Sequence, residues 1–277
     1  MELRNTAIST LQRYCSALER TRLRTDTEGL HRLRVRMKKT RSLLRFLEYL
    51  DSETPPPKGA VRRSKDLFRA AGALREVQVN CARLNDLRTV PADAHTIGLA
   101  HLRKQEERLT KELRRSLERI RPEDFQRLEL HALRVLQGRT MNDLRAAARN
   151  YVKGALDRAT GLTRAADAHL HLHKVRKHLK HVRHIHELLD PGVPEPTGLG
   201  KVLGQLGTWH DELVLRSSLQ EMRKNPEQRS ELLAALDQRL LALRTDAVHR
   251  LQLLFGERDH SPRTKSQRTP FHRPTNT

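Results

Sequence analysis

Two stretches of the chain carry the same four residue types at the same spacing. Each reads His-x-x-Arg-x-x-x-Lys-x-x-Arg, and the two sets are His31, Arg34, Lys38 and Arg41, and His173, Arg176, Lys180 and Arg183. Arginine binds phosphate oxygens through two parallel N–H donors, lysine adds a compact positive charge, and histidine is protonated more readily beside an anion. The chemistry that this combination favours is therefore the binding of phosphate.

The spacing also indicates which structural element positions these side chains. Residues three, four and seven positions apart lie on one face of an α-helix, so each set forms a stripe roughly 15 Å long. Apolar residues recur at equivalent places, with Leu33 matching Val175 and Met37 matching Leu179. The sequence thus predicts two equivalent helices, each with an apolar seam and a separate cationic stripe.

A cationic stripe is often only a solvated helix surface, but three features favour a binding surface here. Between His31 and Phe46 there are seven Lys or Arg residues and no acidic residue, so no ion pair within that stretch relieves their repulsion. The residue types recur in the same order in both stretches, and histidine is a poor choice for solubility alone. Arg45 extends the first stripe whereas Glu187 occupies the equivalent place in the second, so the two halves are not expected to bind equally.

Composition agrees with an anionic partner and excludes several classes of protein. The 277 residues include 54 Lys and Arg against 33 Asp and Glu, a formal net charge of +21. Such an excess is typical of proteins that bind polyanions. Aromatic residues make up only 3%, which argues against stacking of single-stranded bases. The two cysteines are far apart, and neither a signal peptide nor a membrane-spanning run is found, so we expect a cytoplasmic protein without membrane contact.

Apolar periodicity predicts helices throughout and no strands. We expect them at approximately residues 5–23, 30–50, 59–87, 94–119, 142–162, 172–189, 197–222 and 226–255, with 125–138 either a further helix or a structured connector.

The second half of the chain repeats the first. Residues 71–79 align with residues 206–214, and a proline-rich loop follows the second helix of each half, at 51–57 and 190–196. Duplication of a four-helix unit is the simplest explanation. We therefore predict an all-α fold, a tandem duplication of two antiparallel four-helix bundles related by a pseudo-two-fold axis. The two stripes would then line a shared basic groove or pore.

This interpretation sets the expected boundaries. The first half covers about residues 1–121, a connector 122–140 and the second half 141–255, which together form one domain. Residues 256–277 are polar, basic and rich in proline, and are expected to be a disordered tail. The third helix of each half adds candidate ligands, namely Lys65, Arg69, Arg75, Lys201 and His210.

The doubled motif, together with Arg75-Glu76 and His210-Asp211, resembles the CHAD family, the conserved-histidine α-helical domain. The similarity covers about residues 2–255. It implies two four-helix bundles around a basic central cavity that binds inorganic polyphosphate, with the eight motif residues as ligands and association with polyphosphate granules. The family often has Arg-Asp in the third helix, which Arg75-Glu76 and His210-Asp211 only approximate. The Glu-x-Glu-x-Lys motif of the triphosphate tunnel enzymes that often accompany CHAD domains is absent.

Other functions are less well supported. His178, His181 and His184 have a spacing that allows metal chelation, but cationic neighbours disfavour it. His210-Asp211 resembles part of the HD-type metal phosphohydrolase site, whose other ligands have no clear placement. No P-loop, paired-carboxylate site or nucleophile elbow is present.

We therefore predict a binding protein and not an enzyme, with no cofactor and no metal, that binds inorganic polyphosphate. Helical nucleic-acid binding is the principal alternative, because DNA and RNA are also polyanions. The two motif histidines, His31 and His173, are expected to tighten binding as the pH falls from about 8 to about 6.

Overall fold

A computed structural model of the protein describes residues 2–87, 90–164, 168–189 and 194–256. Within these residues the secondary structure consists of nine α-helices: α1 (Glu2–Leu23), α2 (Thr27–Leu50), α3 (Lys58–Asn85), α4 (Ala92–Glu118), α5 (Pro122–Leu136), α6 (Met141–Arg164), α7 (Ala168–Leu189), α8 (Leu199–Gln220) and α9 (Pro226–Gly256).

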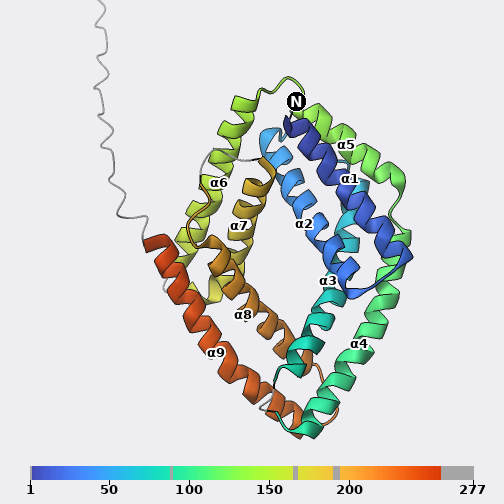
Figure 1. The fold of residues 1–277 in the computed structure, drawn as a ribbon, viewed down its shortest axis with the longest axis vertical. Coiled ribbons are helices and arrows are strands. Elements are labelled where there is room, and N and C mark those ends of the chain that lie inside the picture. Colours follow the sequence, from blue (N-terminus) through green and yellow to red (C-terminus); the bar gives the residue numbers. More distant parts are fainter. Residues whose placement is uncertain (1, 88–89, 165–167, 190–193, 257–277) are drawn as a thin grey trace, which may run out of the picture.

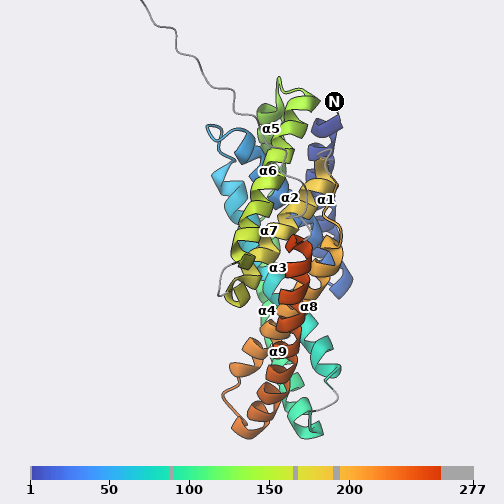
Figure 2. The ribbon, with the colours of Figure 1, turned by 90° about the vertical axis from the view of Figure 1, so that its left-hand side faces the viewer.

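The helices form an elongated closed ring (Figure 1). The most extensive contacts between helices are those within four antiparallel helical hairpins, α1–α2, α3–α4, α6–α7 and α8–α9. Helix α5 packs chiefly on α1. The inner helices α2, α3, α7 and α8 border the middle of the ring, and the remaining helices lie outside them (Figure 1). Seen from the side in Figure 2, most helices run along the long axis of the molecule.

The all-α prediction is confirmed, and the expected helices are present within a few residues of their predicted ends. The segment left open between helix and connector is a helix, α5, in which Pro122 occupies the first turn and the Asp124 carboxylate accepts a hydrogen bond from the Arg121 backbone N–H. The predicted tail lies outside the described residues, apart from Gly256, which ends α9. The domain limits at 121, 140 and 255 stay predictions.

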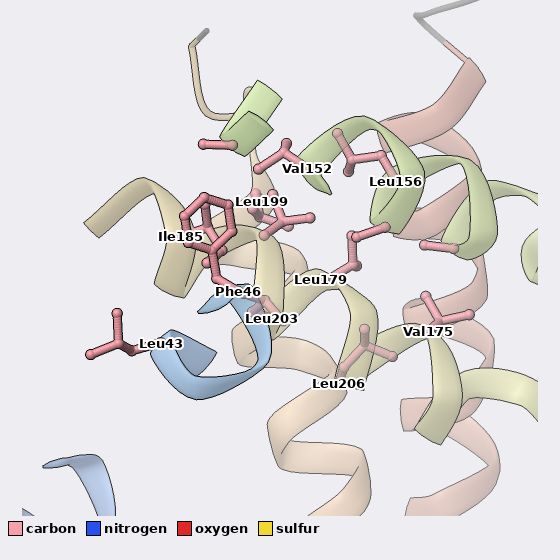
Figure 3. Packing of buried hydrophobic residues seen from close by; sticks show 14 of the residues in the cluster. Leu43, Phe46, Val152, Leu156, Val175, Leu179, Ile185, Leu199, Leu203 and Leu206 are labelled. Carbon is pink, nitrogen blue, oxygen red and sulfur yellow. The ribbon is translucent and has the colours of Figure 1, made fainter. Parts of the chain in front are cut away.

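Packing of each half as a separate four-helix bundle is not confirmed, because both hydrophobic cores contain residues of both halves. One core joins Leu43 and Phe46 of α2 to residues of α6, α7 and α8, as Figure 3 shows. The other joins α2, α3 and α4 to Leu215 of α8 and Leu236 of α9. Each inner helix therefore covers part of the apolar surface of the opposite half.

Burial of the predicted apolar seams fixes the orientation of the two motif helices. Leu33 and Met37 of α2, and Val175 and Leu179 of α7, are all almost completely buried. Each such side chain stabilises the fold by roughly 1.5–3 kcal/mol relative to exposure. Because the seam points into the core, the cationic stripe of each helix is turned away from it.

Polar contacts join the two halves at two places, where an inner helix of one half meets an inner helix of the other. Where α2 meets α7, Lys39 Nζ lies 2.9 Å from Glu187 Oε2. Where α3 meets α8, Asn80 donates to Ser218 Oγ at 3.0 Å, and Arg83 donates to the fully buried Glu212 at 3.1 Å. No described helix combines the length and the apolar surface that a membrane crossing requires.

Candidate functional site

A cavity of about 470 Å³ lies between α2, α3, α7 and α8. Its polar and charged lining residues are His31, Arg34, Lys38, Arg41, Ser42 and Arg45 of α2, Arg75, Glu76 and Asn80 of α3, Arg176, Lys177, Lys180, His181 and His184 of α7, and His210 and Asp211 of α8. These include eight Lys or Arg residues and two carboxylates. The cavity is therefore strongly cationic and is built by both halves of the chain.

Nine of the predicted site residues line this cavity, and they come from both repeats: His31, Arg34, Lys38, Arg41, Arg45, Arg75, Arg176, Lys180 and His210. The predicted shared basic hollow between the repeats is thus present. Five predicted residues do not line it: His173, Arg183, Lys65, Arg69 and Lys201.

The second motif reaches the cavity less completely than the first, for local reasons. The rings of His173 and His210 pack in a T-shaped arrangement with centroids 4.8 Å apart, and of the two only His210 lines the cavity. Arg183 is exposed, and its Nε lies 3.3 Å from Glu187 Oε1. The first motif has Arg45 in place of that carboxylate, and Arg41 remains in the cavity wall.

The three other residues outside the cavity lie on outer surfaces of the third helices. Lys65 and Lys201 are exposed. Arg69 pairs with Asp66 at 3.5 Å and faces a groove between α3 and α4. Their charges add to the general field of the protein, but the structure does not bring them to the cavity.

An aromatic ring and a glycine position the arginines of α2. The guanidinium groups of Arg34 and Arg41 lie over the Phe68 ring, at 5.2 and 4.5 Å from its centroid. Gly72 leaves room for Arg34, because a Cβ at that position would be 2.7 Å from Arg34 Nη1. Sequence reasoning missed Phe68, since an aromatic residue at helical spacing is usually part of the core.

The centre of the cavity holds more positive charge than its carboxylates compensate. Burial, with the nearby Arg176 and Lys38 adding to the effect, lowers the pKa of Lys180 to about 7. Burial likewise lowers the pKa of Lys38 to about 8, with Arg34 and Arg176 adding to the effect. Glu76 has a raised pKa because of its burial. An anion entering the cavity would therefore meet poorly solvated cations that lack full counter-ions.

Burial favours the neutral form of both motif histidines. Burial, with help from Lys177 and other cationic neighbours, lowers the pKa of His173 to about 4. The pKa of His31 is also lowered, chiefly by burial and by Arg75. We expected a bound phosphate to favour the protonated form of these two side chains between pH 8 and pH 6, and burial acts in the opposite direction. Lys180 and Lys38, whose pKa values are lowered to about 7 and about 8, are cavity residues that change charge in this range.

The histidine cluster of α7 makes protein contacts in place of the metal site that its spacing allows. Ser42 Oγ lies 3.2 Å from His181 Nδ1 and 3.0 Å from His184 Nδ1. Within the described part of the chain, no group of three or more His, Cys, Asp or Glu side chains could hold a metal ion. Three of the cavity residues that sequence reasoning missed, Lys177, His181 and His184, lie on the same helix as the second motif.

Two acidic residues also belong to the site. Glu76 and Asp211 line the cavity, and Asp211 is held by Arg83 at 3.3 Å. They occupy equivalent positions of the duplicated third-helix segment, and that equivalence was the available signal for their place in the site.

Comparison with known proteins agrees with this architecture. The family model of the CHAD domain matches residues 6–199. The crystal structure of the CHAD domain from the plant Ricinus communis is similar, with a TM-score of 0.69 and 20% sequence identity over 92% of each chain. PptA from Streptomyces chartreusis has a TM-score of 0.59 and 14% identity over 92% of this chain and 95% of its own. A search of curated proteins found no match.

The two structural similarities, at these identities, concern the fold alone, whereas the family model matches more than half of the 277 residues. The chain therefore belongs to the CHAD domain family.

Proposed function

We propose that the protein binds inorganic polyphosphate in the cavity between α2, α3, α7 and α8, without hydrolysing it. The observation that carries this proposal is the meeting of Arg34 and Lys38 from one repeat with Arg176 and Lys180 from the other, in one partly buried cavity. A row of linked phosphates presents many oxygens to forked guanidinium and compact ammonium donors at once. Membership of the CHAD family is in line with this ligand.

Binding to labelled polyphosphate at several salt concentrations tests the proposal. Because phosphate contacts release condensed counter-ions, we expect the affinity to fall at least roughly tenfold between about 50 and about 200 mM salt. Duplex DNA added as competitor separates the proposed ligand from nucleic acid. Displacement of polyphosphate by an equal concentration of DNA phosphate would instead favour the nucleic-acid alternative.

A matched pair of double variants tests the site itself. Replacing Arg34 and Arg176 together by alanine removes two charged donors from the cavity, and should weaken binding by about a hundredfold or more. Replacing Lys65 and Lys201 by alanine removes the same net charge from outer surfaces and should change affinity only a few-fold. Equal losses in the two variants would show that binding depends on overall charge and not on the cavity.

The absence of catalysis is part of the proposal and has its own measurement. Incubation of the protein with polyphosphate and a divalent cation should release no orthophosphate above the protein-free control. Release that depends on the metal would place the protein among phosphohydrolases. Binding without turnover would also suit recruitment to polyphosphate granules, which localisation of a fluorescent fusion in cells with and without polyphosphate would test.

A further inference from the structure

The contact between α2 and α7 pairs equivalent positions of the two repeats, but the residues at some of these positions differ. Ser42 and His184, which occupy equivalent positions in the two repeats, contact each other at 3.0 Å. On one side of this contact Lys39 pairs with Glu187 at 2.9 Å. On the other side the two equivalent positions hold His181 and Arg45, and Arg45 Nη1 is hydrogen-bonded to His181 Nε2. Equivalent positions of the two repeats therefore form an ion pair on one side of the contact and an arginine–imidazole hydrogen bond on the other.

The two equivalent residue pairs differ in net charge. Lys39 with Glu187 carries none, because the carboxylate offsets the ammonium, whereas Arg45 with a neutral His181 carries one positive charge. Among the described residues, His181 is the hydrogen-bonding partner of Arg45. Burial together with Arg45 lowers the pKa of this imidazole to about 4, so it is neutral. Within the described residues no carboxylate lies within ion-pair distance of Arg45. The Arg45 side of the cavity thus keeps an uncompensated positive charge at its edge.

Helix α6 continues this positive surface beyond the cavity. The Tyr151 ring of α6 packs on Phe46 and Tyr49 of α2, with centroids 5.8 and 5.2 Å apart. About two turns along α6, Arg158 is exposed, and its guanidinium lies beside Gly154, where a Cβ would be 3.4 Å from Nη1.

The charges of Arg158 and Arg45 meet at His178 of α7. Both lower the pKa of this half-buried histidine, after the larger effect of its burial. No acidic residue of the described chain forms an ion pair with Arg158. Arg45 at the cavity and the exposed Arg158 of α6 therefore place two positive charges near His178, and α6 packs against both α7 and α2 at this edge.

We propose that a polyphosphate chain longer than the cavity leaves it on the Arg45–His181 side and continues over α6 past Arg158, and not on the Lys39–Glu187 side. This inference rests on the proposed function, because it takes the same ligand and extends its path. Arg158 lies outside the cavity wall, so short chains held within the cavity do not reach it. Affinity should consequently rise with chain length, and part of that rise should depend on Arg158.

The test compares tripolyphosphate with long-chain polyphosphate on the full-length protein and two variants. Arg158→Ala should weaken long-chain binding by roughly threefold at low salt and leave tripolyphosphate binding unchanged, since an exposed charge contact contributes modestly. Arg149→Ala is the matched control, because Arg149 is also exposed on α6 and lies nine residues earlier, roughly half a turn away around the helix. It should change neither affinity.

Three outcomes would overturn the inference while leaving the proposed function in place: equal effects of the two variants, no effect of Arg158→Ala on long chains, or an equal loss for both ligands. If the unmodified protein bound neither polyphosphate, the proposed function itself would fail, and the path over α6 with it.

Discussion

Replacing Gly72 by alanine should weaken polyphosphate binding without weakening the fold. Gly72 lies within α3, and the three atoms nearest to an added Cβ all belong to the Arg34 guanidinium, with Nη1 at 2.7 Å. That distance is too short for a stable contact, so one of the two groups has to shift. The end of a long arginine side chain moves more easily than a packed helix, and we expect Arg34 to leave its position over Phe68.

The size of both effects follows from this geometry. Loss of one well-placed charged hydrogen bond to the ligand corresponds to about 1.5–3 kcal/mol, or roughly a tenfold to hundredfold loss of affinity. Alanine is favoured over glycine inside a helix by up to about 1 kcal/mol, so the free energy of unfolding should stay equal or rise. Binding and stability are thus expected to change in opposite directions.

Gly207→Ala is the control for this experiment, because Gly207 occupies the equivalent position in the other repeat and nothing lies within 4 Å of its added Cβ. It should gain helix stability and keep its affinity. Fluorescence anisotropy with labelled polyphosphate gives the affinities, and thermal unfolding gives the stabilities. Equal affinity of the two alanine variants would refute the assigned place of Arg34 in the site.

Three further predictions concern pH, arginine positioning and the contact between halves. The pKa values of Lys180 and Lys38 are lowered to about 7 and about 8. Raising the pH from about 6 to about 8 should therefore weaken long-chain binding roughly tenfold, because both lysines must be protonated again to hold the anion. A flat affinity profile at constant ionic strength would contradict this. Phe68→Leu keeps the apolar bulk but removes the ring beneath two guanidinium groups, and should lower affinity a few-fold in titration calorimetry with little change in melting temperature. Glu212→Gln removes a fully buried charge that lies 3.1 Å from Arg83 and 2.8 Å from Arg239. In urea titrations it should lower the free energy of unfolding by about 2 kcal/mol. Binding should stay unchanged, because Glu212 does not line the cavity.

The cavity could be predicted from the sequence because the same cationic stripe occurs in it twice. The identical spacing of Arg34 and Lys38 in one helix, and of Arg176 and Lys180 in another, predicted their meeting between the repeats, and the structure brings all four to one cavity. The buried seams of α2 and α7 also followed from periodicity, since apolar residues at helical spacing have to find cover.

What could not be predicted depends on the neighbours of each helix. Helix α3 carries cations on more than one face, and only its packing against α4 shows that Arg69 lies on an outer groove whereas Arg75 lines the cavity. The low pKa of His173 likewise arises chiefly from burial, which depends on what packs against α7, and less from cations of its own helix such as Lys177. An apolar seam, moreover, does not specify which half of the chain covers it, so cores shared between the repeats were not foreseen.

The shared cores and the cationic cavity are two consequences of one arrangement. The cavity brings together four motif cations in a poorly solvated space, Arg34 and Lys38 from one repeat and Arg176 and Lys180 from the other. These charges repel one another, and in the free protein this repulsion opposes the meeting of the halves. Burial of Phe46 against the second half, and of Leu215 against the first, supplies the opposing attraction. If each half buried its apolar residues only within itself, the cavity charges would tend to separate the halves. A ligand that neutralises these charges removes the repulsion and keeps the attraction, so binding of a polyanion and closure of the ring favour each other.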